Sequence, residues 1–575
     1  MTDQNPLAFK QLSLPLRWLI HRVAKLGVLK GWYDEWLASQ KTGYREFLDF
    51  TLGKINADFS VTNPEQLEHI PKEGPLIIVA NHPLGGLDGM LLSRLLLSVR
   101  PDLKVLTNEM LLGFKEFEEL FVGVDVLNTG QQQKNASGIR RISKHLKQGG
   151  ALLVFPAGTV SVISHLTGQI HDAPWQAMIA KIAQKYQAQC VPLWVEGRNS
   201  RLFYLSGLVH ARLRTLLLPR AMQSPAGPIS VTVGKPAVLS QEVSAEAAID
   251  QLRFQCELLQ PSKLSPATSE VPAVTDINCS EYLAKSAVLL CQREHLSVYC
   301  LSGDKLGPVA AHLYAARAVA FHAVGEGTVG DSDTDQFDEH YDHLILWDHK
   351  CSTIAGAYRA ADIAKVFHER GLAGLYSYSL FHYDECFLQR LGGAIEVGRS
   401  FVAGLYQNNP AALDLLWMGL GAYMVRHPHC HTFFGCVSMS NRLAPMVRAL
   451  LVDTLIDRYG APAETRNMVK AQVPFNYQQR FWSADFIASL SNMAAVNKLL
   501  GSAGNPLRVP ALIRHYLSLN GKFIEFTVNK NFSDSLDGLI YVDLRQTPVR
   551  FIKRYLGKEG AAAFTLRWQE QQDAA

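Results

Sequence analysis

The stretch PLIIVANHPLGGLDGM, residues 75–90, decides the fold of the first part of the chain. Its opening six residues have the apolar pattern of a short buried strand that ends near Ala80. His82 therefore lies where a strand meets a loop, a usual position for exposed chemistry in a layered α/β domain. Gly85 and Gly86 permit a tight turn that returns Asp88 to the histidine. A carboxylate on one imidazole nitrogen leaves the other free to accept a proton. The alternative is a loop histidine capped by an aspartate.

Length and charge restrict the class of protein. A chain of 575 residues is too long for one hydrophobic core, so two or three domains are expected. The formal net charge is +4, with about +5 on residues 1–260 and −1 on the remainder, and this argues against binding nucleic acid by charge alone. Nine scattered cysteines indicate reduced thiols in the cytoplasm. Neither a signal peptide nor a run of 18 apolar residues is present.

Two amphipathic stretches favour attachment to a membrane surface. Leu14 to Leu37 mixes aliphatic residues and three tryptophans with arginines and lysines, and Leu208 to Arg220 has the same character. That composition is typical of helices that lie at a lipid interface. An ordinary helix packed on its domain, with extended Arg and Lys side chains, is the alternative. We expect a cytoplasmic protein, peripheral on the inner face of the cytoplasmic membrane.

The order of elements predicts two domains. Apolar runs at 75–80, 151–155 and 190–195 indicate buried strands, and 91–100 and 137–150 have helical patterns. Strands that alternate with helices predict a layered α/β domain over 1–260. The segment 261–278, rich in Pro, Ser and Thr, is the expected linker. Residues 279–575 have a mixed pattern that predicts an α+β domain. The fold class is therefore α/β, followed by α+β.

Two later segments give the histidine motif a context. FPAGTVS (155–161) and CVPLWV (190–195) each contain or follow a predicted strand. With Asn81, His82 and Asp88, their order resembles the glycerolipid acyltransferase superfamily, whose motifs are NHxxxxD, FPEGTxS and a strand containing Val-Pro. The resemblance implies acyl transfer to a hydroxyl, with His82 as general base, Asp88 holding it, and backbone amides of 155–161 binding the acceptor or the oxyanion. The implied binding residues are Phe155, Pro156, Gly158, Thr159 and Ser161.

Two departures from this family bear on the acceptor. Ala157 stands where the family has glutamate, and 121–130 lacks the arginine that helps the family to bind glycerol phosphate. The pattern is closer to the branch that acylates lysolipids without phosphorus.

Acidic residues dominate the centre of the second half. DSDTDQFDEHYD (331–342) resembles a calcium loop, but its sixth residue is Gln and its twelfth is Asp, so we reject an EF-hand. HPHCH (427–431) lacks a second ligand group with zinc spacing, so we expect no metal site there. An amine is an ammonium cation at neutral pH and must lose a proton before it attacks a thioester. Carboxylates can both bind this cation and accept its proton. Solvated surface pairs are the alternative for each acidic residue.

Seven residues between 317 and 399 indicate the function of the second half more specifically than the acidic residues alone. Their order and spacing resemble the acyl-homoserine lactone synthase branch of the GNAT acyltransferases, and LLWMGLGAYMVRHPHCHTFFGCVSMSN (415–441) is still closer to ornithine N-acyltransferases. The resemblance implies that Glu396 takes the amine proton and that Asp335 and Asp338 place the cationic substrate. It also implies that arginines of the set hold the site or the substrate carboxylate. The set comprises Arg317, Phe321, Asp335, Asp338, Arg359, Glu396 and Arg399.

The two resemblances together match the bifunctional ornithine lipid synthases of bacteria. They imply that the second domain acylates the α-amine of ornithine with a 3-hydroxyacyl group from acyl carrier protein. The first domain then esterifies the 3-hydroxyl of the lyso-ornithine lipid. Neither step requires a metal or another cofactor. The basic stretch 545–558 is a candidate dock for the acidic carrier protein, or an ordinary solvated helix. Open alternatives are a single active half, another amino acid such as glutamine, lysine or glycine, and a non-catalytic membrane scaffold.

Overall fold

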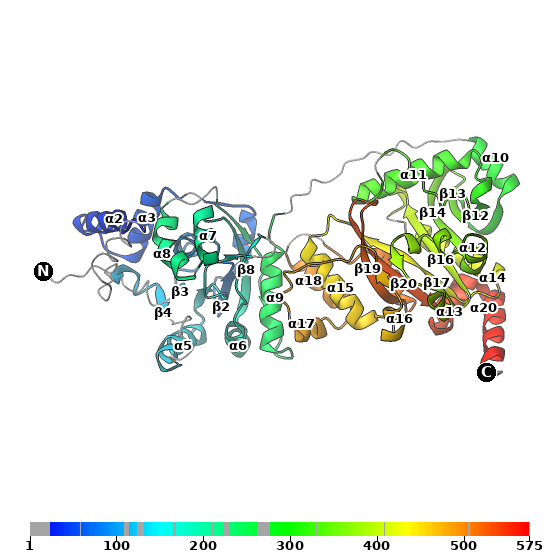
Figure 1. Cartoon of the computed structure of the whole chain (residues 1–575). Helices are drawn as coiled ribbons and strands as arrows, with labels where there is room; N and C mark the ends of the chain where they lie inside the picture. The colour runs from blue at the N-terminus through cyan, green and yellow to red at the C-terminus, as the bar shows by residue number, and fades with distance from the viewer. Residues whose placement is uncertain are drawn as a thin grey trace. The chain divides into compact units, whose positions relative to one another are not determined.

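The chain forms two compact units, each described here by itself (Figure 1). The first unit comprises Met1–Pro261 and Phe481–Arg508, and the second comprises Ser262–Arg480 and Val509–Ala575. The sequence-based domains did not anticipate that 481–508 groups with the first unit, and most of the expected linker lies outside the described residues. The structure is a computed structural model that describes residues 24–57, 59–107, 114–123, 132–164, 168–209, 211–223, 229–261, 277–328, 330–407, 409–503 and 507–573.

The first unit is built around a mostly parallel sheet. Its strand order is β1-β9-β8-β2-β5-β3-β4, with β10 added antiparallel to β8. The strands are β1 (Phe59–Val61), β2 (Leu76–Ala80), β3 (Lys104–Thr107), β4 (Phe121–Gly123), β5 (Ala151–Val154), β8 (Gln189–Glu196), β9 (Ile229–Val233) and β10 (Ala237–Val238). The three predicted strands correspond to β2, β5 and β8, which lie side by side at its centre.

Helices cover both faces of this sheet. All five side chains of β2 are therefore buried. Leu76, Ile78 and Ala80 belong to one core and Ile77 and Val79 to another, as the two-residue period of a strand requires. The helices are α2 (Leu26–Ala38), α3 (Tyr44–Ile55), α4 (Gly86–Leu96), α5 (Gln132–Lys147), α6 (Ala177–Tyr186), α7 (Arg201–Val209), α8 (Ala211–Met222), α9 (Ala245–Glu257), α17 (Ala484–Ser489) and α18 (Met493–Leu500). This two-sided burial confirms the layered α/β prediction.

The segment 481–508 completes the first unit beside helix α9. The guanidinium of Arg253 lies 4.1 Å from the ring centre of Phe481. The buried ring of Phe254 contacts those of Trp482 and Phe486 at 6.2 Å between centres. These contacts show that α9 has an apolar side that only a distant part of the sequence covers.

The second unit contains an eight-stranded sheet with the order β11-β12-β13-β14-β16-β17-β20-β19. Its strands are β11 (Val288–Arg293), β12 (Leu296–Ser302), β13 (Asp342–Asp348), β14 (Thr353–Asp362), β16 (Ala394–Val402), β17 (Thr432–Met439), β19 (Lys522–Asn529) and β20 (Ser535–Asp543), and a separate pair joins β15 (Phe381–His382) to β18 (Lys470–Ala471). Its helices are α10 (Ile277–Ser286), α11 (Val309–Val324), α12 (Ile363–Arg370), α13 (Glu385–Leu391), α14 (Pro410–Arg426), α15 (Pro445–Tyr459), α16 (Ala463–Asn467), α19 (Ala511–Ser518) and α20 (Val549–Asp573). The predicted α+β arrangement is confirmed.

Strands β16 and β17 run parallel and part after three residue pairs. The pairing joins Ala394–Glu396 to Thr432–Phe434. Beyond it, β16 pairs with β14, and β17 pairs with β20. A Cβ atom on Gly435 would lie 2.0 Å from the carbonyl oxygen of Val397, so only glycine permits this approach at the point of parting. The sheet therefore opens beside Glu396.

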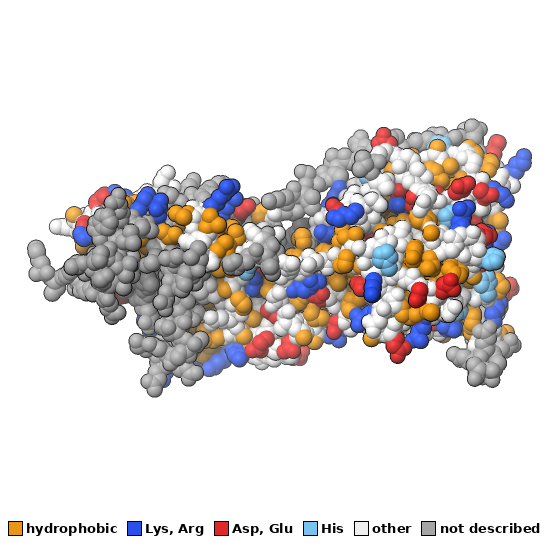
Figure 2. Space-filling model, in the orientation of Figure 1, with side chains coloured by type: hydrophobic (Ala, Val, Ile, Leu, Met, Phe, Trp, Pro, Cys, Tyr) orange, Lys and Arg blue, Asp and Glu red, His pale blue; other side chains and the backbone are white. Residues whose placement is uncertain are grey.

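Among the described residues, no helix is both long and apolar enough to cross a membrane. On the face of the second unit drawn in Figure 2, hydrophobic, basic and acidic side chains are interspersed. That distribution agrees with the small net charge of the chain.

Candidate active sites

The first site joins His82 to Asp88 at the end of β2. Nδ1 of His82 lies 3.1 Å from Oδ2 of Asp88, whose side chain is fully buried, whereas the histidine side chain is 17% exposed. The same carboxylate oxygen accepts hydrogen bonds from the backbone amides of Leu84 and Gly85. Because Nδ1 faces the carboxylate, Nε2 is the nitrogen left for a substrate. Burial raises the pKa of Asp88, and the contact with His82 opposes this shift.

The spacing of this pair differs from the family motif. Five residues separate His82 from Asp88, one more than in NHxxxxD. The chain accommodates the extra residue at Gly85, whose φ of +78° is a left-handed conformation that favours glycine. Helix α4 begins at Gly86, before the helical pattern predicted over 91–100, and Asp88 lies in its first turn.

The segment 155–161 lies against the histidine. The ring of Phe155 packs against that of His82, with centres 4.2 Å apart and ring planes tilted by 30°. The backbone amide of Ser161 donates to the carbonyl of His82, and that of Gly158 donates to the carbonyl of Phe155. These two amides therefore already donate hydrogen bonds within the protein, whereas the family resemblance implied that amides of this turn bind the acceptor or the oxyanion. Pro156 is buried, and its carbonyl accepts from Gln176; Thr159 is half-buried.

Asp172, which no sequence pattern indicated, joins these segments by hydrogen bonds. Its carboxylate accepts hydrogen bonds from Oγ of Ser161, at 2.6 Å, from Nε1 of Trp175 and from the backbone amide of His82. Ala157 is 5% exposed and belongs to a hydrophobic core. Most of the segment 121–130, from which the expected arginine is missing, lies outside the described residues.

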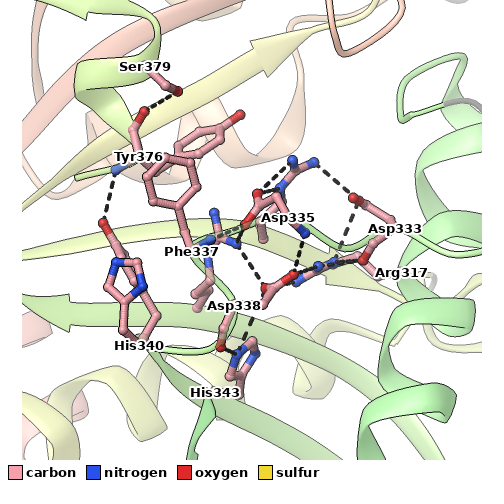
Figure 3. Close-up of polar contacts among 12 residues, drawn as sticks. Arg317, Asp333, Asp335, Phe337, Asp338, His340, His343, Tyr376 and Ser379 are labelled. Atoms are coloured by element: carbon pink, nitrogen blue, oxygen red, sulfur yellow. Dashed lines mark hydrogen bonds and ion pairs between the residues drawn. The ribbon is translucent and has the colours of Figure 1, made fainter. Parts of the chain in front are cut away.

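In the second unit, three aspartates and three arginines form one largely buried network, whose most exposed member is Asp335 (Figure 3). Arg317 donates to both carboxylate oxygens of Asp338, at 3.0 and 2.7 Å, and to the backbone carbonyl of Asp333. Arg359 donates to Asp335 and Asp338. Arg399 contacts Asp335 at 3.0 Å and Asp333 at 3.2 Å.

This network changes the roles of two predicted substrate ligands. Both oxygens of Asp338 accept from arginines, and one also accepts from the backbone amide of Asp335. Despite burial, these contacts hold the pKa of Asp338 well below its usual value and lower that of Asp335. The geometry therefore favours Asp338 as a scaffold for arginines rather than as a ligand for a substrate cation. Asp335, with its side chain 18% exposed, is the more accessible carboxylate.

Glu396 lies where the sheet opens and is 2% exposed. Its oxygens accept hydrogen bonds from the Tyr341 hydroxyl and from the backbone amides of Tyr376 and Ser377. Tyr376 also lies beside Arg359 and Arg399, at 5.2 and 5.3 Å from its ring centre. Glu396 thus fixes the 376–377 backbone, through three of the about four hydrogen bonds that a carboxylate can accept.

The remaining predicted residue, Phe321, is a packing residue on α11. Its ring contacts those of Phe532 and Phe401 at 4.9 and 6.4 Å between centres. Phe532 in turn lies 4.8 Å from the guanidinium of Arg399. Phe321 therefore supports an arginine of the network from behind.

One group in the described residues has three atoms close enough to hold a metal ion. Asp362, His429 and Cys430 each offer a ligand atom within 4.8 Å of the others. Nε2 of His429 already lies 2.7 Å from Oδ2 of Asp362, and burial raises the pKa of the Cys430 thiol to about 12. A hydrogen-bonded pair beside a protonated thiol describes this group, which includes two residues of the HPHCH stretch.

The predicted binding surfaces are partly described. In α2, Trp36 is buried against the core of the first unit, whereas Lys30 pairs with Asp34 at the surface. The rest of the amphipathic stretch, 14–23, lies outside the described residues, as do the side chains of 209–216. On the basic stretch, Arg545 pairs with Asp543 and Arg554 with Asp414, and Arg550, Lys553 and Lys558 are exposed.

Comparison with known proteins finds one family match in each half of the chain. Residues 11–260 match the family described as Acyltransferase, and residues 316–418 match the Acetyltransferase (GNAT) domain. The chain carries an acyltransferase domain followed by a GNAT domain.

Curated relatives are similar over parts of the chain. A glycine N(alpha)-acyltransferase of Bacteroides thetaiotaomicron is 33% identical over 181 residues, which are 29% of this chain and 53% of the relative. The protein of the same name from Phocaeicola vulgatus is 27% identical over 42% of this chain and 78% of its own length. A lyso-glycine lipid O-acyltransferase of Bacteroides thetaiotaomicron is 29% identical over 28% of this chain and 56% of its own length. The chain thus spans about half the length of two of these relatives.

Proposed function

We propose that this chain makes a diacylated amino-acid lipid in two acyl-transfer steps. The observation that carries the proposal is the presence of two acyl-transferring domains in one chain. Its relatives include, as separate proteins, an N-acyltransferase named for glycine and an O-acyltransferase named for lyso-glycine lipid. The product of the first reaction is then the acceptor of the second.

The GNAT domain performs the first step, in which an α-amine attacks a 3-hydroxyacyl thioester. The opening between β16 and β17 leaves strand edges beside Glu396. An extended thioester arm with amide groups can pair with such edges as an added strand does. Acyl carrier protein is the proposed donor, and the exposed cations Arg550, Lys553 and Lys558 suit an acidic partner. No metal or cofactor takes part in this scheme.

The acyltransferase domain performs the second step on the 3-hydroxyl of the lysolipid. Nε2 of His82 takes the hydroxyl proton while the oxygen attacks the thioester carbonyl, and Asp88 keeps the proton of the neutral imidazole on Nδ1. Since the amides of Gly158 and Ser161 are used within the protein, other donors near the turn hold the oxyanion. The lysolipid is an amphiphile, so we place the enzyme on the inner face of the cytoplasmic membrane.

Two amino acids compete as the acceptor. The residue pattern of the second half favours ornithine, whereas the named relatives favour glycine. The chemistry at the α-amine is the same for both, and the difference lies in whether the site also accommodates a second ammonium group.

Lipid mass spectrometry of a host that lacks aminolipids tests the proposal. We expect the intact chain to produce a diacylated aminolipid and His82→Ala to accumulate the monoacyl form, because only the second step loses its base. Fragmentation of the headgroup distinguishes ornithine from glycine. A host that forms no aminolipid with either chain contradicts the proposal, and unchanged diacylation by His82→Ala would remove the first domain from it.

A further inference from the structure

Glu326 is a buried carboxylate that the scheme above does not use. It follows helix α11 and lies between Gly325 and Gly327, whose φ angles are +78° and +104°. These left-handed conformations, which favour glycine, turn the chain sharply. The turn leaves Glu326 only 7% exposed. Burial of an acid without a salt bridge costs stability, so it calls for a reason.

The loop that carries this carboxylate is held from several sides. The guanidinium of Arg442 donates to the carbonyls of Ala323 and His322, at 2.7 and 3.2 Å. Oγ of Ser533 donates to the carbonyl of Gly327 at 2.9 Å. The imidazole of His322 lies 2.8 Å from the carbonyl oxygen of Thr328. The backbone contacts of residues 322–328 therefore fix the position of Glu326.

One oxygen of the carboxylate is engaged and the other is left for a ligand. Oε2 accepts a hydrogen bond from Oγ of Ser438 at 2.7 Å. Across the part of the chain that the structure describes, no donor is found for Oε1. Ser438 lies on β17 beyond Phe434, in the stretch that has parted from β16. The carboxylate is thus attached to the strand that borders the opening of the sheet.

Polar contacts link this position to Glu396. Ser438 is paired across the sheet with Asp537, whose carboxylate accepts from Nδ2 of Asn529 at 2.9 Å. Asn529 also donates to the hydroxyl of Tyr376, at 3.3 Å. The backbone amide of Tyr376 donates to Glu396. Hydrogen bonds and the cross-strand pairing of Ser438 with Asp537 therefore connect Glu326 to Glu396.

We propose that Glu326 is the catalytic base that takes the proton from the ammonium group of the amino-acid acceptor, an inference that rests on the proposed N-acylation. An N–H bond of the ammonium breaks, and its proton passes to Oε1. The nitrogen lone pair then forms a C–N bond to the thioester carbonyl carbon, and the C–S bond breaks. The second proton of the nitrogen goes to the leaving thiolate. The proton on Glu326 is released to water before the next turnover.

The electrostatics of the site suit this role. Burial raises the pKa of Glu326 to about 7; the hydrogen bond from Ser438 opposes the shift, and Asp537 adds to it. Burial also raises the pKa of Asp537, on β20. A base with a pKa near the working pH is available in its charged form and still holds a proton that it has accepted. Glu396, by contrast, is held by three donors.

The test measures N-acylation by the full chain between pH 5.5 and 9, with glycine and ornithine as acceptors and a 3-hydroxyacyl thioester of acyl carrier protein as donor. We expect kcat/KM of the unchanged chain to rise with pH through an inflection near 7. Glu326→Gln should lower kcat about 100- to 10,000-fold at neutral pH and abolish the inflection. Ser438→Ala should move the inflection upward, because it removes the hydrogen bond that lowers the pKa. Glu369→Gln, at an exposed position on α12, is the matched control.

The outcomes separate this inference from the function on which it rests. If the unchanged chain acylates an amino acid and Glu326→Gln keeps both its kcat and its inflection, Glu326 is not the base. A variant that raises only KM for ornithine would make Glu326 a ligand of the second ammonium group instead. An unchanged chain that acylates no amino acid overturns the proposed function together with this inference. Thermal unfolding verifies the fold: the raised pKa means that burying the charge opposes folding as pH rises from 4.5 to 7, so Glu326→Gln should unfold no earlier than the unchanged chain at pH 8.

Discussion

Asp88 decides which nitrogen of His82 carries the proton. In the unchanged chain, Nδ1 faces a carboxylate, so the neutral imidazole keeps its proton there and Nε2 acts as the base. In Asp88→Asn, an oxygen that keeps the hydrogen bonds from Leu84 and Gly85 also keeps facing Nδ1, because one oxygen makes all three contacts. This oxygen is uncharged, so it no longer stabilises the imidazolium that forms when Nε2 takes the substrate proton. We expect kcat of lysolipid O-acylation to fall about 100- to 10,000-fold, measured with purified lysolipid and an acyl thioester.

Asp49→Asn is the matched control for this substitution. Asp49 is 61% exposed and pairs with Arg94 at the surface, so the same chemical change there should leave the rate within a factor of two. Equal unfolding temperatures for the two variants would assign the loss to the missing charge beside His82. A rate in Asp88→Asn close to that of the unchanged chain would show that His82 is not the base.

Reasoning from the residues alone, without the family resemblance, revealed contacts only where the partners are close along the chain. His82 and Asp88 stand in one short segment, so a glycine turn was enough to predict their contact. Asp172 is 90 residues away from His82, whose backbone amide donates a hydrogen bond to it, and no sequence spacing indicates this contact. Glu326 was likewise missed, because its burial depends on Ser438 and on the course of β17.

At the level of elements, the buried ion network ties β14 and β16 to the loop that follows α11. Asp338→Asn removes a charge that faces Arg317 and Arg359, both 1% exposed, and leaves two buried cations with one partner fewer. Breaking a buried pair in this way costs about 3–5 kcal/mol. We expect hydrogen exchange in Thr353–Asp362 and Ala394–Val402 to accelerate and the second unit to unfold at a lower denaturant concentration.

The same network predicts a pH dependence with a definite sign. The folded pKa values of Asp335 and Asp338 lie below the ordinary 3.8, so their stabilising effect is complete above that value and is lost as pH falls below it. Acid should therefore destabilise the unchanged second unit more steeply than Asp338→Asn. Glu464→Gln, which breaks an exposed pair with Arg390, should change stability by about 0.5 kcal/mol or less. A similar loss in both variants would contradict a buried network.

Elements were predicted best where one period dominated the pattern. The strands at 75–80, 151–155 and 190–195 were found because apolar runs of that length, bounded by turn residues, suit a strand buried on both faces. The apolar residues of the run 287–301 suit either a helix or a strand, and the run forms the antiparallel pair β11 and β12. Its polar interruption at 292–295 contains the turn, where Glu294 adopts a φ of +53°.

At the scale of the whole molecule, the chain crosses between its two units three times. The sequence showed one boundary, the Pro- and Ser-rich stretch near 261–278. It did not show that 481–508 belongs to the first unit, because FWSADF carries no local signal for its partners on α9. Only the burial of Phe254, an apolar residue on a helix that already covers the sheet with its other side, points to a missing neighbour.

A fragment that ends at residue 261 should therefore be an incomplete domain. It would expose Phe254 and leave Asp250 without the two hydrogen bonds that it accepts from Ser483. Exposing one large apolar side chain costs about 1.5–3 kcal/mol, enough to favour aggregation of a domain of marginal stability. Fusing 481–508 to residue 261 through a flexible linker should restore a cooperative unfolding transition, as calorimetry would measure. The same fusion with Phe486→Asp is the control and should not. If the fragment 1–261 alone unfolds cooperatively at the temperature of the fusion, the segment is an attachment and not a part of the first unit's core.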